Sequence, residues 1–283
     1  MKRILDRARP LWAAVKLGWA VESNWTDPFV FLVYQIVRPL FAAAILVVMF
    51  HVVTGKPLDS TALAHLYVGS AFFYLVIQSL VNIGFIVMLD RERFQMIRYI
   101  YLAPIGLGPY LAARGLSQVL AAIMAIGITL MAGVLALGIP ISLTTAELPY
   151  FVTAALLGCA ATLSLGVMLA GLSLMLANHG FEMPDGMNGV LFLLSGAVFT
   201  IDILPGPVAS VARTLPWTWW LESLRRVLLD EPFIASLSHL SDGAVLGTLA
   251  ATTAGTVLLS WGVLRGCAHL AVATGKLDQR TDH

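Results

Sequence analysis

Few residues of this chain could catalyse a reaction or bind a metal, and their spacing matches no reactive arrangement. The six histidines are scattered and form no ligand pair at helical spacing. The sequence has no glycine-rich phosphate-binding loop, no paired carboxylates and no catalytic triad. Cys159 and Cys267 lie in or beside apolar runs and form neither a disulfide framework nor a zinc motif. The sequence therefore predicts a protein that is not an enzyme and holds no metal or cofactor of its own.

Two stretches have patterns that indicate function, and the first is the charged segment 90–104. A helix here would carry a polar, basic stripe beside an apolar one, and Pro104 would end it. The stripes would be Arg91, Gln95 and Arg98, and Phe94, Ile97 and Tyr101. A soluble partner could grip such a helix, or the helix could lie on anionic lipid headgroups. The periodicity favours neither interpretation.

The second stretch is the aromatic run 215–222, which contains Trp217, Trp219 and Trp220. Three indole rings so close together could stack on a sugar or on a planar amphiphile. They could also form an aromatic belt at the outer membrane interface, which is the commoner use and the favoured interpretation.

The composition indicates which solvent surrounds these stretches. Of the 283 residues, 59% are hydrophobic and only 12% are charged, whereas a soluble domain has about 25% charged residues. This excludes a soluble enzyme, a disordered chain and a nucleic-acid-binding protein, which needs a basic face. Because a spanning helix takes about 20 apolar residues, the chain has room for six spans in a bilayer.

The apolar runs predict an all-α membrane protein, with one six-span transmembrane domain over residues 29–283. The expected spans are about 29–53, 64–89, 110–137, 148–177, 187–204 and 243–264. Residues 1–28 are expected to form a cytoplasmic tail with an amphipathic interfacial helix over 11–27, where Leu11, Val15 and Trp19 recur every four residues. No early apolar core precedes it, so a removable signal peptide is not expected.

The distribution of basic residues predicts the orientation. If the N-terminus is inside, most Lys and Arg residues fall in inside segments, so both termini are expected in the cytoplasm. Both ends inside require an even number of spans, so the short run 187–204 is expected to cross. Arg38 is expected at the cytoplasmic interface, with a bend at Pro39 and an elbow over 28–37.

Residues 205–240 contain four prolines and are too polar to span a membrane. They predict two short outer helices, about 208–215 and 217–229, that are interfacial or re-entrant between spans five and six. Irregular backbone at membrane depth needs surrounding protein or a wet cavity. The pair is therefore expected to lie against other helices near the outer mouth of a pathway.

The predicted spans have no Asp, Glu, Lys or His near their midpoints. Carriers driven by protons or sodium usually need such groups, so a stand-alone channel or secondary transporter is disfavoured. A membrane scaffold would need a partner but no ATP. If the protein moves a substrate uphill, the energy is expected to come from another chain.

In span four, Gly158, Thr162, Gly166 and Ala170 form a ridge that favours close helix packing.

In order and spacing, several segments resemble the ABC-2 type exporter permeases, the membrane subunits of type V ABC transporters. The segments are Arg38-Pro39-Leu40, Leu102-Ala103-Pro104, Tyr110-Leu111-Ala112-Ala113-Arg114, Leu194-Ser195-Gly196-Ala197-Val198-Phe199, Leu204-Pro205 and Leu215-Pro216-Trp217-Thr218, followed by Glu222 and Arg225. Two positions depart from the family pattern. Phe94-Gln95 stands where many members have Gly-Thr, and Thr200 stands where a proline is common.

The resemblance implies half of a transporter. Two permeases, identical or homologous, would enclose a pathway lined by spans one, two and five. Two cytoplasmic ATP-binding subunits would hold ATP and magnesium and drive transport. The cargo would be a hydrophobic or amphiphilic molecule, drug-like or lipid, exported from the cytoplasm across the cell (inner) membrane. A polysaccharide or glycolipid is the alternative, since the aromatic residues of span two would suit either.

The resemblance also implies roles for particular residues. A coupling helix over residues 90–103 would dock into the ATPase through Asp90, Arg91, Glu92, Arg93, Phe94 and Arg98. The inner elbow would be formed by Arg38 and Pro39. The outer re-entrant gate would include Phe199, Pro205, Pro216, Trp217, Trp219, Trp220, Glu222 and Arg225.

Overall fold

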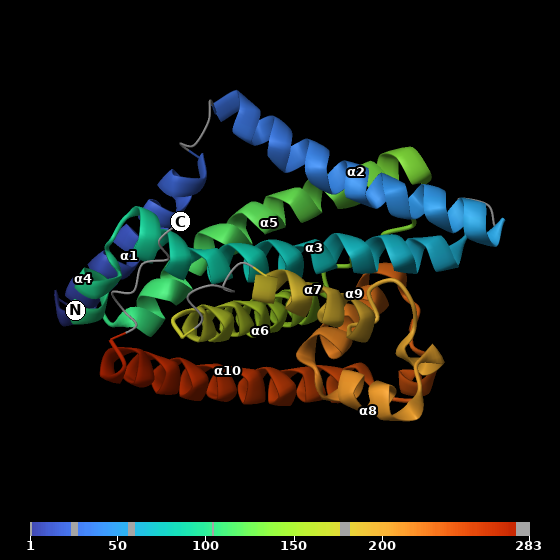
Figure 1. The fold of residues 1–283 in the computed structure, drawn as a ribbon. Helices are drawn as coiled ribbons and strands as arrows, with labels where there is room; N and C mark the ends of the chain where they lie inside the picture. Colours follow the sequence, from blue (N-terminus) through green and yellow to red (C-terminus); the bar gives the residue numbers. More distant parts are fainter. Residues whose placement is uncertain (1, 24–27, 56–59, 104, 176–181, 276–283) are drawn as a thin grey trace.

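The computed structural model describes residues 2–23, 28–55, 60–103, 105–175 and 182–275, and within these ranges it contains helices and no strand (Figure 1). Five of the helices are long and apolar enough to cross a membrane. They are α2 (Pro28–Thr54), α3 (Thr61–Met88), α5 (Leu107–Leu137), α6 (Leu148–Ser173) and α10 (Asp242–Ala273). By length and composition, this finding confirms the first, second, third, fourth and sixth predicted spans.

Local chemistry explains several helix ends. Ser60 and Ser241 precede α3 and α10, and each side-chain hydroxyl accepts a hydrogen bond from a backbone N–H of the first turn. Gly138 ends α5 in the left-handed conformation, with a φ of 65°, which glycine adopts without steric cost. Pro39 lies inside α2, which runs without interruption from Pro28. The candidate span starts at Gln35, before Pro39, so the first span is not divided at the proline.

The fifth predicted span differs from the prediction. The helix here, α7 (Glu182–Leu194), has 13 residues, and a turn and the short 3-10 helix η2 (Ile201–Ile203) follow it. At about 1.5 Å per residue, α7 is about 20 Å long, which is shorter than the hydrocarbon core of about 30 Å. A continuous helix over 187–204 is therefore wrong. The chain turns at Gly196, whose φ is 72°, and the adjoining carbonyls bind a buried arginine instead of continuing the helix.

The N-terminal helix α1 (Lys2–Ser23) packs against α5. Ala14, Val15 and Gly18 form the buried contact, whereas Leu11 and Trp19 are exposed. The predicted face of Leu11, Val15 and Trp19 is thus only partly buried. The helix also begins earlier than expected, and residues 24–27 of the predicted helix lie outside the described residues.

The ridge of small residues on α6 is confirmed as a packing surface within the chain. A Cβ at Gly158 would overlap the indole of Trp220, and one at Gly166 would press on Ile83 of α3. Thr162 and Ala170 are fully buried. Small residues allow α3, α6 and the helix that carries Trp220 to approach closely.

The remaining short helices gather at the two ends of the bundle. The π-helix η1 (Leu89–Arg93) continues α3, and α4 (Ile97–Leu102) lies near α1 at one end (Figure 1). At the opposite end, α8 (Gly206–Thr214) and α9 (Pro216–Leu229) lie where two short helices were predicted, and η3 (Ala235–Leu237) follows them. Their re-entrant position in a membrane stays a prediction. Both begin slightly earlier than predicted because a proline occupies the first turn, where its missing N–H costs nothing.

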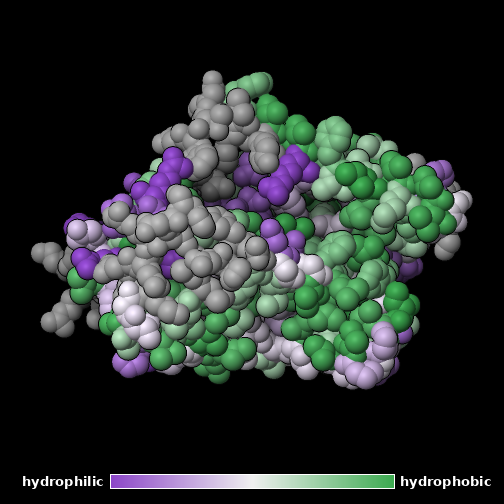
Figure 2. All heavy atoms as spheres, viewed as in Figure 1, coloured by the Kyte–Doolittle hydropathy of each residue, from purple (hydrophilic) through white to green (hydrophobic). Residues whose placement is uncertain are grey.

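The flanks of the bundle are hydrophobic. Figure 2 shows apolar side chains along the visible face of α2. The exposed residues of α2 include Phe41, Ile45, Val48 and Val52. In water such a surface would be a liability, but in a bilayer it is the face that contacts lipid or another membrane helix.

We expect Gly158→Ala to destabilise the protein by about 1–3 kcal/mol, the usual cost of overpacking a close-packed contact. The new methyl group would displace the Trp220 ring. The matched control is Gly255→Ala in α10, where a Cβ would meet nothing within 4 Å. The control should be neutral or slightly stabilising, because alanine favours helices. Thermal unfolding midpoints of the two purified variants in detergent test this, and equal midpoints would contradict the packing.

Candidate functional sites at the two ends of the helix bundle

The segment expected to be a single charged helix is broken. The backbone N–H of Phe94 bonds to the carbonyl of Leu89 at 2.9 Å, which is the wider π-type turn, and Gln95 takes a positive φ of 52°. The chain restarts as the six-residue helix α4. The predicted helix over 90–103 is therefore wrong, and the break falls where Phe94-Gln95 replaces the family's Gly-Thr pair. π-turns and left-handed residues of this kind gather at functional sites.

A buried polar cluster anchors this segment to α5. The carboxylate of Asp90 is completely buried and accepts hydrogen bonds from Tyr110 Oη at 2.8 Å and from Arg114 Nη1. Arg114 Nη1 also donates to Tyr110 Oη at 3.0 Å. A charged pair this deep is costly to break, because either partner alone would be an uncompensated charge. The cluster therefore holds η1 rigidly against the first turns of α5.

The burial of this segment separates its predicted docking residues into two groups. Asp90 and Arg91 are buried and Glu92 is half-buried beside Arg91, whose Nη2 lies 3.6 Å from Glu92 Oε1. The exposed residues are Arg93, Phe94, Gln95, Arg98, Tyr99, Tyr101 and Leu102. The exposed face thus combines positive charge with apolar surface, whereas Asp90 holds the segment in place. The predicted apolar stripe is divided, because Ile97 packs in the core.

The inner elbow residues lie on α2. Arg38 is exposed and Pro39 is buried. Pro39 also lines a cavity of about 310 Å³ between α2, α3, α5 and α7. The structure thus places Pro39 at a cavity wall, with Arg38 outside it.

At the other end, Arg225 on α9 is the central residue. Its guanidinium is completely buried and donates to three backbone carbonyls, those of His65 at 3.0 Å, Gly196 at 2.9 Å and Ala197 at 2.7 Å. It also lies 4.1 Å from the centre of the Phe233 ring, a cation–π contact. Burial lowers the pKa of Arg225 to about 9, with Glu222 acting in the opposite direction, so the side chain is still charged at neutral pH.

Glu222 joins the same helix to the chain that follows it. Its buried carboxylate accepts from Arg226 Nε at 3.0 Å and from the backbone N–H of Ile234 at 3.2 Å. Arg226 also donates to the carbonyls of Leu237 at 2.6 Å and Leu240 at 2.8 Å. Glu222 and Arg226 therefore fix the path from α9 to α10, and Arg226 was not among the predicted gate residues.

The three tryptophans are core residues, which corrects both sequence interpretations. Trp217, Trp219 and Trp220 are all buried, so they form neither an outer belt nor an open stacking platform. Trp217 Nε1 donates to Thr162 Oγ1 of α6 at 3.1 Å, and Trp219 Nε1 donates to the carbonyl of Arg213 at 2.8 Å. Because α9 is only a short helix, its large rings supply the contact area that holds it against α6.

The other predicted gate residues lie around this helix. Phe199 is half-buried in the turn after α7, Pro205 is exposed at the start of α8, and Pro216 is buried at the start of α9. Arg225 donates to the carbonyls of Gly196 and Ala197, which lie in the same turn as Phe199. The structure therefore brings Phe199 and Arg225 into one region. Pro205 lies outside this contact.

Sequence reasoning missed Tyr110 and Arg114 as partners of Asp90. Both were singled out only as part of the segment 110–114 that resembles the family. The available signal was the i, i+4 spacing of Tyr110 and Arg114, which puts both on one helix face, together with a lone arginine in an apolar run. Within the described residues, no group of three or more His, Cys, Asp or Glu side chains could hold a metal ion.

Long apolar helices with polar clusters at both ends define a multi-pass α-helical membrane protein. A sequence model of the family "ABC-2 type transporter" matches residues 11–229, which include Asp90, Arg114, Glu222 and Arg225. The chain belongs to the ABC-2 type transporter family, and it is the membrane permease component of an ABC transporter. A search of curated proteins finds no match to this sequence.

We expect Arg225→Lys to destabilise the protein by at least about 1–3 kcal/mol, because an ammonium group cannot reproduce the planar fork that serves three buried carbonyls. The control is Arg213→Lys, which changes a half-exposed arginine at the same end of the bundle and should cost less than about 0.5 kcal/mol. Thermal unfolding of both purified variants measures the difference. If Arg225→Lys were as stable as the control, the three carbonyls would not depend on the guanidinium.

Proposed function

We propose that this chain is the permease of an ATP-driven exporter that carries a hydrophobic or amphiphilic small molecule out of the cytoplasm. The observation that supports this most is the cavity of about 310 Å³ between α2, α3, α5 and α7. Its volume lies near the lower end of the range for small-molecule pockets. Its walls come from the first, second and fifth predicted spans, together with the third.

The lining of this cavity favours an apolar cargo. It contains Phe73, Tyr74 and Phe192 among aliphatic residues and no charged side chain. Two of its three hydroxyls donate to carbonyls within their own helices, Ser70 Oγ to that of Tyr67 and Thr129 Oγ1 to that of Ala125. At such an apolar wall, many hydroxyl groups of a glycan would be buried without hydrogen-bond partners. Each such burial costs free energy of binding. The polysaccharide alternative is therefore less favoured.

The energy would come from a partner ATPase. In the candidate spans of the described chain, all Asp, Glu, Lys and Arg residues except Asp242 lie towards the end that carries α1 and α4. Asp242 is the first residue of α10, at the opposite end. The others are Arg38, Asp90, Arg91, Glu92, Arg93, Arg114 and Arg265. Ion coupling would need such groups near the middle of the membrane. A second permease copy or homologue would complete the pathway around the cavity.

The same end would face the cytoplasm and the ATPase, in the inner membrane of the cell. This orientation follows from the excess of basic residues there. The exposed face around η1 and α4 would dock into the ATPase, and the pair of Asp90 and Arg114 would transmit movement of that face to α5. Opposite, α8 and α9 would form the outer gate, held by Arg225.

Charge reversal tests the docking face. Arg93→Glu combined with Arg98→Glu should weaken association with the ATPase about tenfold, because exposed interface charges mainly steer and orient partners. Arg91 is unsuitable because it is buried. The control is Arg9→Glu, an exposed arginine on α1 at the same end. The readout is co-purification with the ATPase at defined salt concentrations. Undiminished co-purification of the double variant would remove the docking assignment.

Filling the cavity tests the cargo. Ala42→Trp would add an indole at the cavity lining on α2, whereas Ala44→Trp adds the same group outside the lining, and both alanines are exposed. In liposomes that contain the permease and its ATPase, Ala42→Trp should raise the concentration of a hydrophobic dye for half-maximal transport about tenfold, equivalent to about 1.4 kcal/mol. The control should match the unmodified protein. Equal effects of both variants would place the transport path elsewhere.

A further inference from the structure

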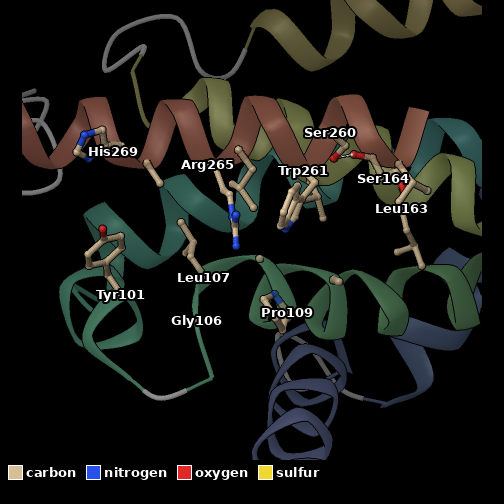
Figure 3. Close-up of a pocket in the computed structure, with 16 residues that line it drawn as sticks. Tyr101, Gly106, Leu107, Pro109, Leu163, Ser164, Ser260, Trp261, Arg265 and His269 are labelled. Atoms are coloured by element: carbon tan, nitrogen blue, oxygen red, sulfur yellow. Dashed lines mark hydrogen bonds between the residues drawn. The ribbon is translucent and has the colours of Figure 1, made fainter. Parts of the chain in front are cut away.

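A second and larger cavity, of about 580 Å³, lies on another side of the chain, between α5, α6 and α10 (Figure 3). Its lining is almost entirely apolar and includes Leu163, Val167 and Leu264. Two polar groups in it are already paired with each other, because Ser260 Oγ of α10 donates to the backbone carbonyl of Ser164 in α6. The long apolar part of this groove therefore suits hydrocarbon and offers little to a polar ligand.

One end of the groove carries positive charge without a carboxylate. Arg265 lines it, with His269 one turn further along α10, and no Asp or Glu is among the lining residues. The Arg265 guanidinium lies 3.7 Å from the centre of the Trp261 ring. Figure 3 shows both side chains pointing from α10 across the gap toward Gly106 and Pro109 at the start of α5. Arg265 forms no ion pair with any described residue.

The groove has the length of one membrane leaflet. Its lining on α10 extends from Val257 to His269, which at about 1.5 Å per residue is about 18 Å. Half of the hydrocarbon core is about 15 Å thick. The charged end lies toward α1 and α4. Next to Val257, at the other end of the lining on α10, Leu258 and Leu259 are 70% and 60% exposed. The groove is thus beside an apolar surface, and in the proposed orientation its positive end would lie at the cytoplasmic membrane interface.

We propose that this groove binds one anionic phospholipid of the leaflet at the α1 and α4 end. Arg265, held in place by Trp261, would donate hydrogen bonds to the phosphate, because a guanidinium fork matches phosphate geometry. An acyl chain would lie along Leu163, Val167 and Leu264. The site goes beyond the proposed transport function, because it lies between different helices from the cavity of α2, α3 and α7. A bound lipid would join α10 to the first turn of α5.

Native mass spectrometry of the full-length chain in detergent tests this without the ATPase or a cargo, so it is independent of the transport proposal. The probes are phosphatidylglycerol and phosphatidylcholine with identical acyl chains. The unmodified chain should bind its first phosphatidylglycerol about fivefold more tightly than phosphatidylcholine, equivalent to about 1 kcal/mol for one basic side chain at an anionic membrane surface. Arg265→Gln should abolish this preference, and Arg265→Lys should retain most of it.

Two further variants distinguish a built site from general attraction. Arg9→Gln removes an exposed charge at the same end, outside the groove, and should leave the preference unchanged. Ala112→Phe fills the apolar part of the groove and should weaken the binding of both lipids. Equal binding of the two lipids by the unmodified chain would overturn the proposal. So would a preference that survives Arg265→Gln, or one that Arg9→Gln reduces as much as Arg265→Gln does.

Discussion

The buried guanidinium of Arg225 is the interaction on which the outer half of this structure depends. A charge removed from water must be fully compensated, and here three carbonyls and one aromatic ring do so. Those carbonyls come from the second turn of α3 and from the turn after α7. One side chain on α9 therefore joins three segments far apart in the sequence. It also explains why α7 stops at Leu194, since the next carbonyls serve Arg225 rather than a helix.

The opposite end uses a buried charge in a similar way. Asp90 is compensated by Tyr110 and Arg114, which fixes the π-helical end of α3 against α5. Between these two polar clusters the helices carry little charge and pack through small residues such as Gly158 and Gly166. This arrangement leaves room for the apolar cavity beside α2 and α7 while both ends stay rigid. A movement of the exposed face at η1 and α4 would thus reach the cavity through α3 and α5.

Much of the fold could be predicted from the sequence, because the membrane imposes simple rules. Twenty or so apolar residues must form a helix, so five long helices and the two short ones between prolines were predicted with errors only at their ends. The fifth predicted span failed, because hydrophobicity alone does not reveal that backbone carbonyls at Gly196 and Ala197 bind a side chain from elsewhere. The charged helix failed for a related reason, because the π-turn at Leu89 depends on the burial of Asp90.

By itself, the sequence determined the solvent of this protein, its helical class and the family whose motifs it carries. Composition, the length of apolar runs and the spacing of prolines are properties of the chain itself, and they do not depend on contacts between distant segments. Only the tertiary structure decided which polar residues are anchors and which are exposed. The sequence pattern predicted that the aromatic side chains of Trp217, Trp219 and Trp220 lie at the surface, but they are core residues. It likewise predicted Asp90 as a docking residue, but Asp90 is buried. Burial depends on contacts between distant segments, such as Trp217 with Thr162, and periodicity within one segment cannot specify them.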